Sequence, residues 1–179
     1  MDKPEPNLHF RIMSFAFGFR DIFLPRKNIL EEVGITPGVG VLDYGCGSGG
    51  YITAAAELVG DSGKIYALDI HPLAIECARR IASRNHLLNV ETIQSDCATG
   101  LPDGSIDVVL LYDVFHKLSD PDSVLAELHR VLTPDGILSF SDHHLNEDEL
   151  VSGVTGGGLF ELSKKGGKTY SFLCCSAPE

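Results

Sequence analysis

The sequence predicts an α/β fold: a doubly wound, mostly parallel sheet with helices on both faces. Short apolar strands alternate with amphipathic helices from residue 40 onward, which is typical of parallel βα units. A glycine-rich loop over residues 45–50 joins the first of these strands to a helix. The last segments, LFELSKK and KTYSFLCC, flank Gly166-Gly167 and predict a β-hairpin, so an antiparallel pair closes the run.

The chain of 179 residues is long enough for one domain with a full core, and we divide it after residue 24. Residues 1–24 comprise a short tail and a Phe-rich segment, residues 7–24, which predicts a helix. This segment is either a lid over an apolar pocket or an ordinary packing element that could also contact a second copy; we take it as a lid. Residues 25–179 form the predicted α/β domain.

The first half of the domain begins with the predicted helix PRKNILEEVG, which starts at Pro25 and ends at Gly34. Ile29, Leu30 and Val33 lie on one face of this helix. The next four elements alternate, and they are the strand GVLDYG, the helix GYITAAAELVG, the strand GKIYALD and the helix PLAIECARRIASRNH.

In the second half, NVETIQS predicts a third strand and SIDVVLLYD a fourth. The fourth is apolar throughout, as expected for a central parallel strand that helices cover on both faces. Asp120-Pro121 opens the helix SVLAELHRVL, and Pro134-Asp135-Gly136 predicts a turn into the fifth strand, ILSFSD. NEDELVSG predicts one more helix before the hairpin.

Composition narrows the classes of partner. A net charge of −11 argues against a nucleic-acid partner, because such binding depends on clustered Lys and Arg. No apolar run approaches the roughly 20 residues of a membrane span, and the charged N-terminus MDKPEPN predicts no signal peptide, so we expect a cytoplasmic protein. The five cysteines contain no C-x-x-C pair and are expected to be reduced thiols rather than metal ligands.

The glycine loop matches two nucleotide-binding patterns at once. Gly45, Gly47 and Gly50 give G-x-G-x-x-G, whereas Asp43 with the glycines at 45, 47 and 49 gives D-x-G-x-G-x-G. The following helix N-terminus offers N–H groups and a partial positive charge. Asp69 ends the second strand, where an acidic side chain can accept hydrogen bonds from ribose hydroxyls. These features fit both NAD and S-adenosylmethionine.

Asp43 favours S-adenosylmethionine. A carboxylate two residues before the first glycine would lie near the pyrophosphate of a dinucleotide, an unfavourable placement. S-Adenosylmethionine instead carries an ammonium and a sulfonium cation, for which a carboxylate is favourable. No second substrate domain accompanies the loop, which also argues against an NAD-dependent oxidoreductase.

With these segments the chain resembles class I S-adenosylmethionine-dependent methyltransferases, in particular the ubiquinone/menaquinone-biosynthesis-like (type 11) group. The resemblance covers residues 25–179 and rests on VLDYGCGSGGY, IYALDIHP, QSDCATGLPDGSIDVVLLYDVFHKL and LHRVLTPDGILSFSD. It implies a seven-stranded Rossmann-like sheet whose last strand inserts antiparallel between the fifth and sixth. It also implies in-line methyl transfer from S-adenosylmethionine to a small-molecule acceptor, with S-adenosylhomocysteine as the product.

The resemblance assigns the cofactor-binding residues. The amino acid end of the cofactor would lie against the first strand end and the glycine loop, and the methionine portion would approach the end of the fourth strand. These positions are Asp43, Tyr44, Gly45, Gly47, Gly49 and Tyr112.

The nucleoside would be held by the ends of the second and third strands. Asp69 would take both ribose hydroxyls, and Ile70 would lie on the adenine. Asp96 would accept from the exocyclic amine, with Cys97 beside the ring. The plainer alternatives are a helix cap for Asp69 and a turn residue for Asp96.

A general base is needed only if the acceptor must lose a proton early. The candidates are His116, His143, Asp113 and Tyr112, all near the ends of the fourth and fifth strands. His116 could instead hydrogen-bond a neighbouring loop. Adjacent histidines rarely converge on one ion, so His143-His144 predicts a loop role and we expect no metal site.

Other assignments stay open. A cofactor-binding module without catalysis would look the same at the glycine loop. Cys174-Cys175 could suggest thiol or arsenic chemistry, but neighbours in a strand point to opposite faces, and two small core residues are the favoured interpretation. We expect a monomer or a homodimer. The acceptor atom is not specified by the sequence.

Overall fold

The structure is a computed structural model that describes residues 4, 6 and 26–175. The predicted Phe-rich lid, residues 7–24, lies outside the described residues, as does Pro25, so the lid stays a prediction.

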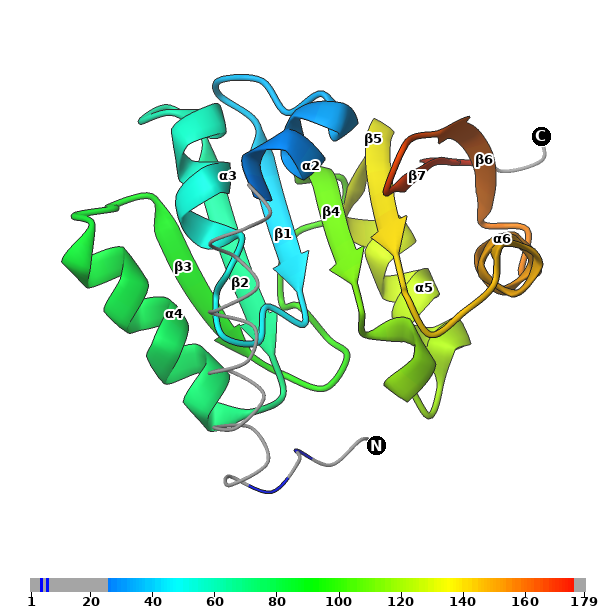
Figure 1. Cartoon of the computed structure of the whole chain (residues 1–179), viewed down its shortest axis with the longest axis horizontal. Coiled ribbons are helices and arrows are strands. Elements are labelled where there is room, and N and C mark those ends of the chain that lie inside the picture. The colour runs from blue at the N-terminus through cyan, green and yellow to red at the C-terminus, as the bar shows by residue number, and fades with distance from the viewer. Residues whose placement is uncertain (1–3, 5, 7–25, 176–179) are drawn as a thin grey trace.

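A seven-stranded sheet forms the centre of the molecule, in the order β3-β2-β1-β4-β5-β7-β6 (Figure 1). Neighbouring strands from β3 to β5 are parallel, and β7 runs antiparallel to both β5 and β6. The predicted sheet, with its last strand inserted antiparallel, is therefore confirmed. The strands are β1 Gly40–Tyr44, β2 Lys64–Asp69, β3 Val90–Gln94, β4 Ile106–Tyr112, β5 Leu132–Ser141, β6 Phe160–Lys165 and β7 Tyr170–Cys174.

Three of the helices begin where the sequence provides caps. Pro72 and Pro121 open α4 and α5, and the side chain of Asp120 accepts a hydrogen bond from Ser123 N. Asn146 and Glu149 form a capping box at the start of α6. The helices are α2 Arg26–Val33, α3 Ile52–Val59, α4 Pro72–Arg84, α5 Pro121–Val131 and α6 Glu147–Thr155, with a 3₁₀ turn, η1, at Phe115–Lys117.

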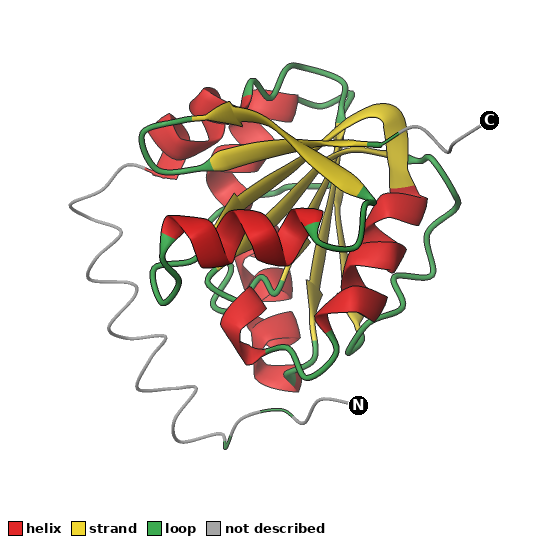
Figure 2. Cartoon of the chain, turned by 90° about the vertical axis from the view of Figure 1, so that its right-hand side faces the viewer, coloured by secondary structure: helices red, strands yellow, loops and turns green. Residues whose placement is uncertain are grey.

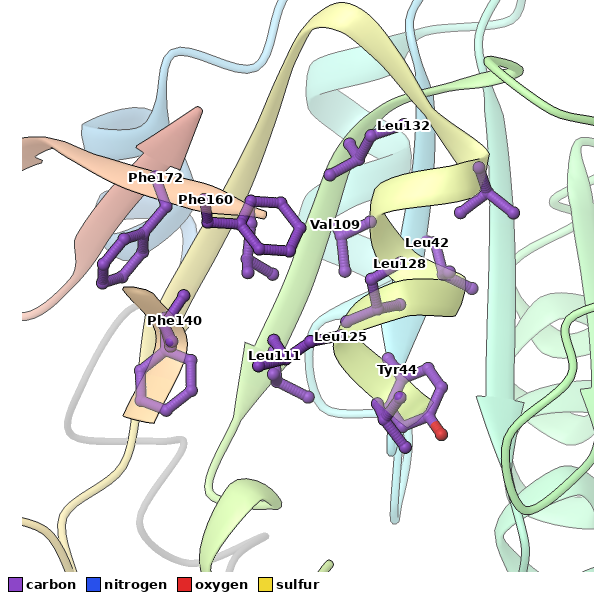
Figure 3. Packing of buried hydrophobic residues seen from close by; sticks show 14 of the residues in the cluster. Leu42, Tyr44, Val109, Leu111, Leu125, Leu128, Leu132, Phe140, Phe160 and Phe172 are labelled. Carbon is purple, nitrogen blue, oxygen red and sulfur yellow. The ribbon is translucent and has the colours of Figure 1, made fainter. Parts of the chain in front are cut away.

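Helices cover both faces of the sheet (Figure 2). On one face, α5 and α6 bury an apolar cluster that includes Leu125, Leu128 and the aromatic rings of β5, β6 and β7 (Figure 3). On the other face, α2 and α3 pack against β1, β2 and β4, and α4 contacts α3 beyond them. Burying both faces supplies the main apolar driving force for the fold.

Strand order reverses between β1 and β4, so the chain leaves these neighbouring strands toward opposite sides of the sheet. Open α/β sheets bind ligands outside the carboxyl ends of the strands at such a point. The glycine loop after β1 and the segment after β4 meet there, because a Cβ on Gly45 would lie 2.2 Å from Val114 Cγ2.

The fifth strand differs from the sequence prediction. We predicted a turn at residues 134–136 before the strand, but β5 begins at Leu132 and includes them. Ile106 pairs with Leu132 and Val108 with Ile137, so the extra residues are absorbed as an irregularity of the ladder. The turn-forming residues bend the strand at a bulge instead of ending it.

Glu127 on α5 anchors the loop that carries Asp96 and Cys97. Its Oε1 accepts hydrogen bonds from Thr99 N at 2.7 Å and Thr99 Oγ1 at 2.6 Å. Arg130 donates to both carboxylate oxygens, each at 2.8 Å. These contacts, with Arg130 as the largest influence, lower the pKa of Glu127 from 4.5 to about 2.

We predict that Glu127→Gln lowers the free energy of unfolding by about 1–2 kcal/mol near neutral pH, because a charge-assisted anchor becomes a neutral one. The folded pKa is lowered, so this stabilisation is complete above the unfolded value of 4.5 and is lost as the pH falls toward 2. Urea unfolding at about pH 7 and about pH 3.5 measures it. A gap between wild type and variant that does not shrink at the lower pH would contradict the anchor.

Candidate functional site

The glycine loop adopts backbone angles that side chains disfavour. Gly45 has φ +80° and Gly49 has φ +80°. A Cβ on Gly49 would lie 2.7 Å from Ile81 Cδ1, so α4 packs directly on the loop. The N–H groups of Gly45 and Cys46 both donate to Leu68 O, which ties the loop to β2. The loop is therefore held in one shape before any ligand arrives.

The loop leads into α3, whose N-terminus has no side-chain cap. Tyr51 is the N-cap residue, and its side chain makes no capping hydrogen bond. The first N–H groups of a helix have no partner within the helix, and they carry partial positive charge. Among the described residues, this end of α3 thus has no capping side chain, and its partial positive charge would favour a ligand that offers acceptor oxygens.

Asp43 is buried beside this loop. In the part of the chain that the structure describes, its Oδ2 is the buried side-chain polar atom without a hydrogen-bond partner. Burial raises the pKa of Asp43 to about 7, against the opposing effect of the positive charge of Arg26. A buried carboxylate without a partner is unfavourable, so a cation that binds next to Oδ2 would satisfy it.

Arg26 is a site residue that sequence reasoning missed. Its guanidinium lies over the Tyr51 ring, 4.3 Å from the centroid. It also lies against the loop, since a Cβ on Gly50 would be 2.5 Å from Arg26 Cζ. Arg26 opens α2, and only the packing of α2 on α3 brings it here. No local pattern could have identified it.

Asp69 lies at the end of β2, as predicted, but it already has two backbone donors. Gly47 N donates to Oδ2 at 2.9 Å, and His71 N donates to Oδ1 at 2.8 Å. Burial, the largest influence, raises the pKa of this carboxyl, and the two backbone hydrogen bonds oppose the rise. A carboxylate has about four acceptor positions, so two remain for ribose hydroxyls.

The predicted adenine-side residues lie around the next loop. Ile70, Asp96 and Cys97 are all half-buried. Tyr44 supports this loop, because its hydroxyl donates to Asp96 O at 3.1 Å. Its ring is buried in the apolar cluster that α5 covers. The hydroxyl group therefore contacts the loop with Asp96 from the α5 side of the sheet.

Tyr112 lies away from the candidate bases. Its hydroxyl shares a hydrogen bond of 2.6 Å with Ser139 Oγ inside the core, and burial raises its pKa. Its ring contacts Tyr51 at a centroid distance of 5.0 Å. The structure thus groups Tyr112 with Tyr51 and Arg26, beside the glycine loop, and not with the histidines.

The histidines and two carboxylates gather where β4 and β5 end. His143 contributes its N–H, at 3.2 Å, and its Nδ1, at 2.6 Å, to Asp113 Oδ1. Asp142 is buried and accepts from His116 N at 3.1 Å and from His144 N at 3.1 Å. Its Oδ2 also lies 2.8 Å from His116 Nδ1.

The three imidazole rings lie next to one another at tilted angles, with interplanar angles of 42° and 41°. His144 lies between His116 and His143, with both centroid distances 4.0 Å. The hydrogen bonds from His116 and His144 oppose the effect of burial and lower the pKa of Asp142. Sequence reasoning selected His116, His143 and Asp113 but missed Asp142. The available signal was an Asp at the end of a buried strand, the same pattern that identified Asp69.

The adjacent cysteines lie elsewhere. Cys174 and Cys175 line a cavity of about 290 Å³ together with His129 and residues at the start of β5. Strand starts and strand ends of a parallel sheet lie at opposite edges, so this cavity is remote from the glycine loop.

Comparison with known proteins identifies the family. A family model described as a methyltransferase domain matches residues 35–171. A demethylmenaquinone methyltransferase from Geobacillus stearothermophilus is 31% identical over 130 residues, which are 72% of this chain and 56% of that relative. The chain thus spans just over half the length of this curated relative.

Solved structures agree on the fold. An S-adenosylmethionine-dependent methyltransferase from Aquifex aeolicus aligns with a TM-score of 0.81 and 24% identity, over 96% of this chain and 98% of that chain. An arsenic(III) S-adenosylmethionine methyltransferase from Chlamydomonas reinhardtii has a TM-score of 0.55 and 35% identity, over 60% of this chain and 40% of the other. Within the described residues, no helix has the length and apolar character that crossing a membrane requires.

Proposed function

The chain belongs to the family of S-adenosylmethionine-dependent methyltransferase domains that the sequence predicted, and from this premise we propose that it transfers a methyl group to a small-molecule acceptor. The observation that carries the proposal is the buried Oδ2 of Asp43, which has no hydrogen-bond partner within residues 26–175 and lies beside the glycine loop. A dinucleotide would bring phosphate charge toward this carboxyl, whereas S-adenosylmethionine brings an ammonium.

The residues around the loop fit each part of S-adenosylmethionine. Asp43 would hold the ammonium, and Arg26 the carboxylate, for which a guanidinium is well suited. The remaining acceptor positions of Asp69 would take the ribose hydroxyls, and Ile70 with Asp96 would hold the adenine. When bound, the cofactor supplies a methyl group on a sulfonium; the protein contributes alignment and exclusion of water.

The acceptor would approach from the ends of β4 and β5. The polar cluster of Asp113, Asp142 and the three histidines supports a small acceptor with an ionisable hydroxyl or an acidic carbon. The relative from Geobacillus is named for a quinone precursor, which is also a small molecule. An arsenic acceptor is less well supported, because Cys174 and Cys175 lie at the opposite edge of the sheet.

Three further expectations belong to this proposal. The Phe-rich segment, residues 7–24, would act as the lid that keeps water from the transfer site. The protein would work in the cytoplasm, as a monomer or a homodimer.

Release of S-adenosylhomocysteine with labelled cofactor and a panel of hydroxylated acceptors tests the activity. Cofactor binding without turnover on any acceptor would favour a non-catalytic module.

We predict that affinity for S-adenosylmethionine rises about five- to tenfold between about pH 6 and pH 7.5. The ammonium binds the ionised form of Asp43, whose pKa in the free protein is about 7, so binding below that pH releases a proton. Calorimetric titration in buffers of different ionisation enthalpy measures both affinity and proton release.

Asp43→Asn is the control for this pH dependence. The variant should bind the cofactor more weakly at pH 7.5 and show no rise with pH. The raised pKa means that ionised Asp43 destabilises the free protein as the pH rises from 3.8 through about 7, so the variant should be at least as stable as wild type at pH 7.5. A pH-dependent affinity that persists in the variant would assign the effect to another group.

We predict that Arg26→Met weakens binding of S-adenosylmethionine about 10- to 100-fold, because a charge-assisted contact with the cofactor carboxylate is lost. Binding of adenosine, which lacks the amino acid part, should change little. Arg79→Met is the matched control, since Arg79 is exposed on α4 and bonds Thr92. An equal loss of affinity for both ligands would mean that Arg26 only supports the loop.

A further inference from the structure

We propose that Asp113, Asp142 and His143 form a binding site for a divalent transition-metal ion at the edge of the sheet where β4 and β5 end. One ligand atom from each residue lies within 4.8 Å of the other two. The sequence predicted no metal site, because His143-His144 alone lacked partners at a distance along the chain. The structure supplies those partners.

The sheet register brings the two carboxylates together. β4 and β5 are parallel neighbours, and Tyr112 pairs with Ser141 at their ends. The next residue of each strand is an aspartate, and Asp113 N donates to Ser141 O at 2.8 Å. Both carboxylates therefore leave the same edge at the same level, and His143 follows directly.

The ligand set suits a borderline cation. Two carboxylates and one imidazole offer hard oxygen and intermediate nitrogen donors, a combination that suits ions such as Mn²⁺, Co²⁺ or Zn²⁺ better than Ca²⁺. At metal–ligand distances of about 2.1 Å, ligand atoms on an octahedron are about 3 to 4 Å apart. The span of 4.8 Å closes to this range if the outer side chains shift slightly.

The structure has one rigid ligand and two adjustable ones. The Asp142 side chain is 0% exposed, whereas those of Asp113 and His143 are 28% and 57% exposed. Asp142 accepts from the backbone N–H groups of His116 and His144 and contacts the His116 ring, so its orientation is fixed. His116 Nδ1 lies 2.9 Å from Oδ1 and 2.8 Å from Oδ2, so this one donor contacts both oxygens. An ion would take the acceptor position that becomes free when Nδ1 keeps its contact with only one of them.

Binding of the ion requires that it replace the hydrogen bond between His143 and Asp113. His143 Nδ1 and Asp113 Oδ1 now share a proton at 2.6 Å. If Nδ1 becomes the ligand, that proton moves to Nε2 of the same ring, or leaves to solvent when the ring starts protonated. His116 and His144 stay in place as the residues that orient Asp142, a supporting role typical of metal sites.

The ion would define the acceptor class, and this part rests on the proposed function. Three protein ligands leave positions for two adjacent oxygens of an acceptor, one of them an ionisable hydroxyl. The hydroxyl proton leaves to solvent on binding. The oxygen lone pair then forms the new bond to the methyl carbon while the carbon–sulfur bond breaks, and its electron pair stays on the sulfur of S-adenosylhomocysteine.

Titration of the free protein with Mn²⁺, followed by calorimetry and electron paramagnetic resonance, tests the site without cofactor or acceptor. We expect one ion per chain in wild type and at least about tenfold weaker binding in Asp113→Asn and in His143→Gln. Asp148→Asn and His86→Gln, both exposed elsewhere, are the matched controls and should bind as wild type does. Thermal melts confirm that each variant folds.

Two outcomes would overturn the proposal: no saturable Mn²⁺ binding by wild type up to millimolar concentration, or equal binding by wild type and the two site variants. Titration of wild type with S-adenosylmethionine is run in parallel. Failure there would reject the proposed function and leave the metal site standing, so the two failures are distinguishable.

Discussion

The proposed cofactor site depends on Oδ2 of Asp43, a buried carboxyl oxygen that has no hydrogen-bond partner among the residues that the structure describes. Burial raises its pKa to about 7, so near neutral pH both the protonated and the ionised form of Asp43 are populated. Arg26 favours the ionised form and Asp69 opposes it. A bound ammonium would favour the ionised form, and on the proposed function this carboxyl would recognise that cation.

Two other carboxylates at this edge of the sheet, those of Asp69 and Asp142, have hydrogen-bond partners. Asp69 and Asp142 each accept a backbone N–H group from the segment that follows them, so each of them fixes the loop after its strand. Asp69 also accepts from Gly47 and thereby joins the glycine loop to the end of β2. Parallel strands make this possible, because every strand of the parallel set delivers its following residue to the same edge.

Local sequence patterns predicted most of the fold and some of the residues of the candidate site. Strand and helix periodicity, with proline starts such as Pro72 and Pro121, predicted the order of elements, and family membership confirmed the sheet. The bulge in β5 was missed because residues 134–136 have turn chemistry that a sheet can also absorb. Arg26 and Asp142 were missed for another reason: the packing of α2 on α3 and the register of β4 with β5 place them, and neither is encoded in a local motif.

During methyl transfer the two positive groups of the cofactor behave differently, so on the proposed function Asp43 and the carboxylates after β4 and β5 would have different effects. The ammonium keeps its charge during methyl transfer, so Asp43, if it holds this group as proposed, would contribute equally to substrate and product binding. The sulfonium loses its charge, and carboxylates close to it would stabilise the starting state and repel an oxyanion acceptor. On the proposed function, Asp113 and Asp142, which follow β4 and β5, would be the carboxylates on that side. A divalent cation would neutralise the two carboxylates, and neither the stabilisation of the sulfonium nor the repulsion of an oxyanion acceptor would then oppose the reaction. The electrostatics of methyl transfer is therefore consistent with the proposed metal ion.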